Sequence, residues 1–118
     1  MEENEFSVNL YLTDLQILQE TADQIKKDFS FFSLEITFSG NKEEAYSELY
    51  NQIYPHIKNL MDSDYEKFLS LLYRIDLNEK QIYPVQSADK SEEPAKTISG
   101  LIIKRCLQKV ILRKLYST

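Results

Sequence analysis

The sequence predicts an all-α fold, a single up-and-down bundle of about four helices in which residues 1–118 form one domain. The 118 residues include only two glycines and three prolines, whereas sandwiches and barrels need a turn residue about every ten positions. Apolar residues make up 42% and charged residues 28%, which is ordinary for a globular domain with a core. Four segments also carry apolar residues at helical spacing.

The first predicted helix covers residues 13–31. It begins at "TDLQ", a capping-box pattern in which the Thr13 hydroxyl accepts from the Gln16 N–H and the Gln16 side chain reaches back. Apolar residues then recur at steps of three and four, which places on one stripe Leu15, Leu18, Ala22, Ile25 and Phe29.

The segments on either side of this helix have a different pattern. Residues 6–12 ("FSVNLYL") and 33–39 ("SLEITFS") alternate apolar and polar side chains, which is typical of strands. They could pair as a minor two-stranded ribbon. Because an isolated ribbon is marginally stable, the alternative is that both are extended segments, the second ending at Gly40.

The second predicted helix spans 42–60 and has one apolar arc. Pro55 lies on the opposite, polar side, where it either bends the helix or divides it in two. The third predicted helix, 64–76, follows the capping-box pattern "SDYE" at 63–66. Residues 84–94 are polar and poor in apolar side chains, so we expect an exposed loop.

The last predicted helix begins between Ala95 and Ser99 and ends near Tyr116. Its apolar side is expected to close the core with Ile103, Cys106, Leu107, Val110 and Ile111.

The opposite side of the last helix is basic and includes Arg105, Lys109 and Arg113. All 19 acids lie in residues 1–100, whereas 101–118 carry five cations and no acid. These cations could oppose the negative end of the helix dipole and pair with acids in the same chain, or they could dock an acidic partner.

Acids for such pairing within the chain are Asp76, Glu79 or residues 89–93. Arg74 and Asp76 form a candidate polar cluster at the end of the third helix. Being two positions apart, they point in different directions, so each is expected to meet another helix. Ion pairs of this kind determine how the helices align more than they add to stability. A structural role in pairing is favoured over a small functional site.

Three tyrosines lie along one edge of the second helix, at Tyr46, Tyr50 and Tyr54. Each ring can be buried while its hydroxyl reaches water, and such edges are enriched at interfaces. The alternatives are that the rings seal the rim of the bundle or that they form a surface for a partner or a second copy.

No residue is predicted to be catalytic, to ligate a metal or to bind a cofactor. His56 is the only histidine, and no catalytic base or second metal ligand lies at a suitable spacing from it in the sequence. Cys106 on the apolar side is expected to be a buried, inert thiol. Gly40 and Gly100 are far apart in sequence, so there is no phosphate loop.

We expect a cytoplasmic protein without a membrane role. The acidic N-terminus is unlike a secretory signal, no apolar run is long enough for a membrane span, and a lone cysteine suits a reducing compartment. The net charge of −5 disfavours nucleic acid as a partner.

Two segments, "LLYRIDLNE" and "LIIKRCLQKVILRK", together resemble a group of small uncharacterised bacterial proteins, in which a YRID-type helix end precedes a basic final helix. The resemblance covers about a third of the chain and implies an all-helical fold without supplying site residues. The function that the sequence favours is a non-enzymatic module for protein binding or self-association. The alternative is a nucleic-acid-associated protein that uses the basic side of the last helix.

Overall fold

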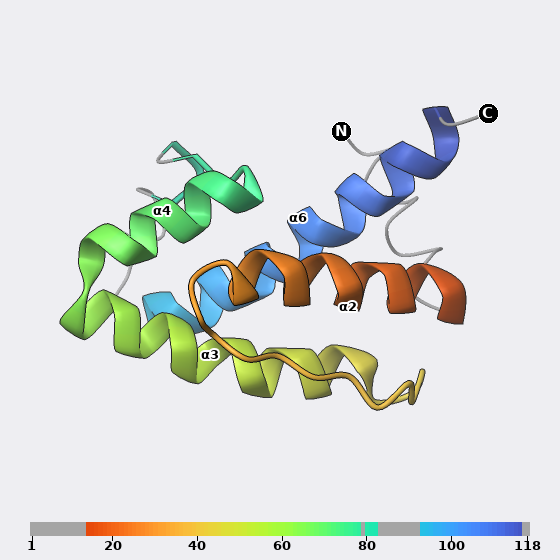
Figure 1. Ribbon diagram of the computed structural model, residues 1–118, viewed down its shortest axis with the longest axis horizontal. Coiled ribbons are helices and arrows are strands. Elements are labelled where there is room, and N and C mark those ends of the chain that lie inside the picture. Colours follow the sequence, from red (N-terminus) through yellow and green to blue (C-terminus); the bar gives the residue numbers. More distant parts are fainter. Residues whose placement is uncertain (1–13, 79, 83–92, 117–118) are drawn as a thin grey trace.

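The computed structural model describes residues 14–78, 80–82 and 93–116 (Figure 1). Over these residues the fold is all-α, as predicted, with four main helices: α2 (Leu15–Ser30), α3 (Ala45–Ser63), α4 (Tyr65–Ile75) and α6 (Pro94–Tyr116). Residues 6–12, Thr13, Glu79 and the greater part of the predicted loop, 84–92, lie outside the described residues. Pro94, placed in that loop by the prediction, instead begins α6.

Helix α6 is the central element of the bundle. It packs against both α2 and α3, while α4 contacts each of the other three helices (Figure 1). Helices α2 and α3 run in the same direction in Figure 1, and α4 and α6 run back. The bundle departs from simple up-and-down order here because an extended segment returns the chain between α2 and α3.

The core lies where the apolar sides of these helices meet. Its largest fully buried side chains are Phe29, Phe68, Ile17, Ile25, Leu49, Ile53, Ile57, Leu71, Ile75, Ile98, Ile102 and Leu107. The apolar side predicted for the last helix is buried, as are the apolar arcs of the first and second helices apart from Leu15, which is 42% exposed. A separate small cluster joins the start of α2 to the second half of α6 through Ile17, Leu107, Val110 and Ile111.

Of the two alternatives for residues 33–39, the strand is wrong and the extended segment ending at Gly40 is observed. Residues 34–40, here called the strap, are extended but belong to no sheet among the described residues. The Gln52 side chain of α3 accepts from the Thr37 N–H at 2.8 Å and donates to the Thr37 carbonyl at 2.8 Å. One amide thus occupies both backbone groups that a neighbouring strand would pair. The alternation in sequence arises because Ile36 and its neighbours two residues away pack on the core while the residues between face water.

Two helix ends differ from the predicted caps. The Asp14 carboxylate caps α2 by accepting from the Ile17 N–H at 3.2 Å. The cap of α4 is Asp64, not Ser63, and it accepts from the Lys67 N–H at 3.1 Å. Ser63 is instead the last residue of α3. Both aspartates satisfy backbone donors that the first turn leaves free.

Helix α3 is continuous through Pro55, so the prediction of two pieces does not hold. Pro55 is exposed, on the side of the helix opposite the buried Ile53 and Ile57. The backbone hydrogen bond lost at a proline is tolerable there because water can satisfy the freed carbonyl.

Candidate interaction surface

A buried carboxylate joins three helices at one polar junction. Asp28 of α2 has a side chain only 4% exposed, and its Oδ1 accepts from Arg74 Nε of α4 at 3.1 Å. Lys109 Nζ of α6 lies 4.0 Å from its Oδ2 and donates to the Ile75 carbonyl at 2.9 Å. The Gln24 amide donates to both carboxylate oxygens at 3.2 Å. We call these residues, apart from Ile75, the polar junction.

The two members of the predicted cluster do meet other helices, as expected. Arg74 reaches Asp28, and its guanidinium lies 4.3 Å above the centroid of the Phe31 ring. Asp76 accepts from Arg105 Nη2 at 2.6 Å across the gap to α6. Asp76 also ends α4 in the left-handed conformation, with φ 73°, which aspartate tolerates better than most residues.

The basic side of α6 is largely used inside the chain. Arg105 pairs with the predicted Asp76, whereas Lys109 meets Asp28, an acid outside the predicted partners. Arg113 Nη1 donates at 2.8 Å to the Gln24 side-chain oxygen, a neutral group. A signal for Asp28 was present, since it lies seven residues after Thr21 and three after Ile25, on the buried stripe of α2. An acid on such a stripe needs a buried partner.

The tyrosine edge faces the first turns of α6. The Tyr50 hydroxyl donates to the Lys96 carbonyl at 3.2 Å, and the Tyr54 hydroxyl donates to the Glu93 carboxylate at 2.7 Å. The rings stack along the helix, with 5.9 Å between the centroids of Tyr46 and Tyr50 and 6.4 Å between those of Tyr50 and Tyr54. Tyr46, half exposed, passes so close to α6 that a Cβ at Gly100 would lie 3.1 Å from its hydroxyl. The edge therefore seals the seam between α3 and α6.

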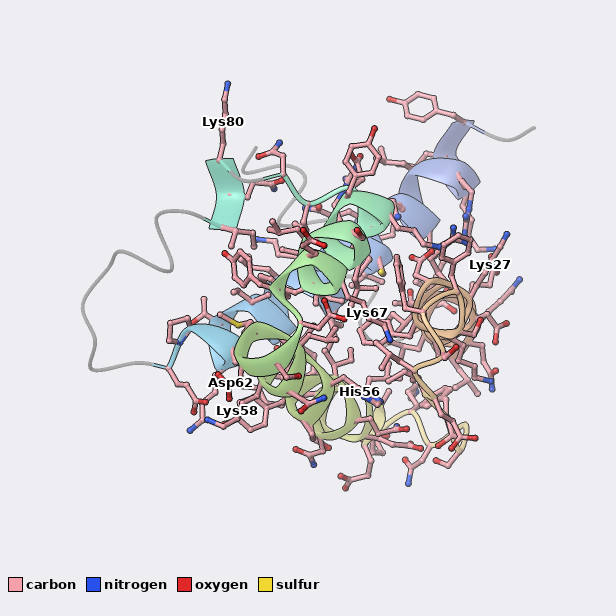
Figure 2. All side chains as sticks on the ribbon, turned by 60° about the vertical axis from the view of Figure 1, so that its left-hand side comes forward. Lys27, His56, Lys58, Asp62, Lys67 and Lys80 are labelled. Atoms are coloured by element: carbon pink, nitrogen blue, oxygen red, sulfur yellow. The ribbon has the colours of Figure 1, made fainter. Side chains whose placement is uncertain are left out.

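Glu93 is held at this seam by two donors. Lys58 Nζ lies 2.7 Å from one carboxylate oxygen, beside the Tyr54 hydroxyl. These hydrogen bonds, that of Lys58 first, lower the pKa of Glu93 below its ordinary value. The same contact raises the pKa of Lys58. Figure 2 shows Lys58 on the side of α3 toward the start of α6.

His56 and Cys106 both have structural surroundings. Figure 2 shows His56 between α3 and the strap, and its Nε2 lies 3.0 Å from the Glu35 carbonyl. Cys106 is fully buried, and desolvation raises the pKa of its thiol to about 12. Among the described residues, no group of three His, Cys, Asp or Glu side chains is placed to hold a metal ion. None of the described helices is long and apolar enough to cross a membrane.

Large apolar side chains are exposed at the end of α6. Leu112 is 40% exposed, Leu115 56% and Tyr116 82%. Their spacing of three and four residues puts them within one arc of the last turns, in which Leu115 lies one turn beyond the buried Ile111. We call these three residues the α6-end surface. The sequence shows these apolar residues, with Leu112 on the basic side of the predicted helix, but no role was predicted for them.

An open depression of about 540 Å³ adjoins this surface, between α2 and the end of α6. It is lined by Glu20, Arg113, Lys114 and Tyr116. Lys114 Nζ lies 2.8 Å from Glu20 Oε2, and this hydrogen bond lowers the pKa of the Glu20 carboxyl. Tyr116 therefore belongs both to the α6-end surface and to the lining of this depression, and Arg113 lies beside it.

No family model, curated protein or solved structure matches the chain. The resemblance to small bacterial helical proteins is not tested by these comparisons and stays a prediction.

Proposed function

We propose that the protein is a non-enzymatic helical module that binds a protein partner through the α6-end surface. The observation that carries the proposal is the exposure of Leu112, Leu115 and Tyr116 on one side of α6. Large apolar groups gathered on a surface mark protein-binding sites more often than scattered ones do. The lone Cys106 also supports the cytoplasmic location that we propose for the module.

The surface that the sequence favoured is less suited to this role. Tyr50 and Tyr54 direct their hydroxyls into the seam with α6. Arg105 and Lys109 are engaged with Asp76 and with the polar junction. A partner that bound these groups would have to displace contacts that hold the bundle together, whereas the α6-end surface is accessible without such a cost.

The test compares a double variant, Leu112→Ser with Leu115→Ser, to the wild-type chain in affinity capture from the native cell. Because both side chains are exposed, the double variant should stay folded, which circular dichroism and thermal unfolding would verify. The matched control is Tyr73→Ser, since Tyr73 of α4 is 87% exposed but lies outside the surface. A protein captured by the wild type and the control, and lost with the double variant, supports the proposal.

The proposal fails if no captured protein depends on Leu112 and Leu115. Interface substitutions of this kind reduce affinity mainly through faster dissociation, so capture should be repeated with mild crosslinking before washing. Proteins that remain bound to the double variant after crosslinking have a contact elsewhere on the molecule.

Nucleic-acid association is the second candidate, favoured by the composition of α6. This helix carries Lys96, Lys104, Arg105, Lys109, Arg113 and Lys114 and no acid. Binding of this kind weakens steeply with added salt, because phosphate contacts release counterions. Gel retardation of DNA and RNA at low salt, repeated with Arg113→Gln, tests it. No retardation by the wild-type chain would end this alternative.

A further inference from the structure

We propose that the partner presents an acidic, amphipathic helix to the α6-end surface. This inference rests on the proposed function and adds the chemistry of the occupant. Leu112, Leu115 and Tyr116 follow the spacing by which one helix contacts another. A second helix laid along them would meet apolar side chains at the end of α6 and polar ones further back.

The charges next to the apolar residues indicate what flanks the partner's apolar stripe. Residues 105, 109, 112 and 116 recur at steps of four, three and four, so Arg105 and Lys109 continue the same side of α6 toward its start. Arg113 borders the other edge of Tyr116. The α6-end surface is therefore apolar, with the exposed Arg113 at its edge, while Arg105 and Lys109 further back on the same side are paired within the chain.

Pairing within the chain leaves this region positive. Its five cations are Arg74, Arg105, Lys109, Arg113 and Lys114, and the acids that contact or neighbour them are Asp28, Asp76 and Glu20. Five cations against three acids leave an excess of two positive charges. Arg113 carries part of it, since its described contact is the neutral oxygen of Gln24. Carboxylates on a partner would complement this excess and speed association.

Charge also argues against two other occupants. A second copy related by a two-fold axis would place Arg113 and its neighbours against themselves, which is repulsive. An anionic lipid surface would attract α6 but repel the remainder of the chain. That remainder holds all 19 acids and 8 of the 14 cations, because six cations lie in α6, so its net charge is −11.

The experiment titrates the full chain with two fluorescent peptides of about 16 residues, capped at both ends. Both carry leucine at helical spacing of three and four residues, with glutamate at the other positions of the first peptide and lysine in the second. Fluorescence anisotropy should show binding of the glutamate peptide, and at least about tenfold weaker binding of the lysine peptide. Added salt should weaken the glutamate complex.

Variants assign this binding to the surface. Leu115→Ser and Arg113→Glu should each weaken the glutamate peptide by about tenfold or more. The matched control is Lys80→Glu, because Figure 2 shows Lys80 extending away from the helices, and its affinity should equal that of the wild type. Equal binding of both peptides, or an Arg113→Glu chain that binds as the wild type does, would overturn the inference.

Two further results would identify another occupant and also overturn it. These are a dimer in sedimentation that Leu115→Ser dissociates, and binding to phosphatidylglycerol-containing vesicles that Leu115→Ser abolishes. If cellular capture depends on Leu112 and Leu115 while the peptides fail, only this inference falls. If no capture depends on them, the proposed function falls.

Discussion

Asp28 is the residue at which three helices depend on one side chain. A carboxylate that is 4% exposed loses most of its hydration, and that loss is offset here by Arg74, Lys109 and the Gln24 amide. The two cations keep partial access to water, with side chains 30% and 21% exposed. The junction therefore selects how α2, α4 and α6 meet more than it adds to total stability.

Removing the carboxylate should be costly. We expect Asp28→Ala to lower the free energy of unfolding by about 2–4 kcal/mol, because Arg74 and Lys109 would keep their burial and lose their counter-charge. Urea denaturation measures this, with Asp23→Ala as the control, since the Asp23 side chain is 68% exposed. Combining Asp28→Leu with Arg74→Met should recover much of the loss. An Asp28→Ala chain as stable as the control would mean that the junction contributes nothing.

At the scale of an element, the strap is fixed to α3 by side chains in place of a sheet. Gln52 holds both backbone groups of Thr37, and Glu48 accepts from the Ser39 N–H at 2.8 Å and from the Ser39 hydroxyl at 2.8 Å. His56 adds a contact to the Glu35 carbonyl. All three residues lie along α3, so the strap depends on that helix being formed.

The bidentate geometry can be tested by removing only the donor. Gln52→Glu keeps an acceptor for the Thr37 N–H but cannot donate to the Thr37 carbonyl. We expect it to cost about 1 kcal/mol, whereas Gln52→Ala, which also removes the acceptor, should speed hydrogen exchange at the Thr37 amide. Asn51→Ala, at the exposed neighbouring position on α3, is the control. If hydrogen exchange at Thr37 were unchanged in Gln52→Ala, the Gln52 side chain would not be what holds the strap.

The seam between α3 and α6 should respond to acid. The pKa of Glu93 is lowered from 4.5, so its contacts stabilise the fold above about pH 4.5 and are lost as the pH falls through the lowered value. The pKa of Lys58 is raised from 10.5, so the contribution is also lost as the pH rises through that higher value. Unfolding of Glu93→Gln, followed from pH 7 to pH 3, should lose less stability than the wild type. Parallel curves would contradict this.

At the scale of the whole molecule, the apolar periodicity of the sequence predicted which side of each helix is buried. It did not predict which elements contact one another. The stripes of α2, α3 and α6 follow from spacing alone, because a helix of this composition can only bury its apolar side. The strap shows the limit of that argument. The alternation of apolar and polar residues, with Leu34, Ile36 and Phe38 apolar, indicates that one side of an extended segment is buried. It does not indicate which element covers that side.

The polar contacts were predictable only in part. The Arg105–Asp76 pair was one of the pairings that the sequence suggested, between an acid at the end of the third helix and the basic side of the last one. Asp28 and Lys109 are 81 positions apart, and their contact depends on how α2 and α6 cross. To predict the α6-end surface from the sequence, one would need to know which side of the last helix the bundle leaves exposed.

Cys106 offers a measure of the stability of the whole bundle. It is fully buried, and its thiol pKa rises from 9.0 to about 12, so at pH 8 the folded chain presents almost no thiolate. An alkylating reagent should therefore react through opening of the core, at a rate that follows the population of opened molecules. Leu71→Ala, which removes a fully buried side chain, should cost about 2–5 kcal/mol and speed labelling at least about 30-fold. Leu115→Ser, at an exposed position, should leave the rate unchanged. Labelling of the folded wild type as fast as the urea-unfolded chain would show that Cys106 is reached without opening the bundle.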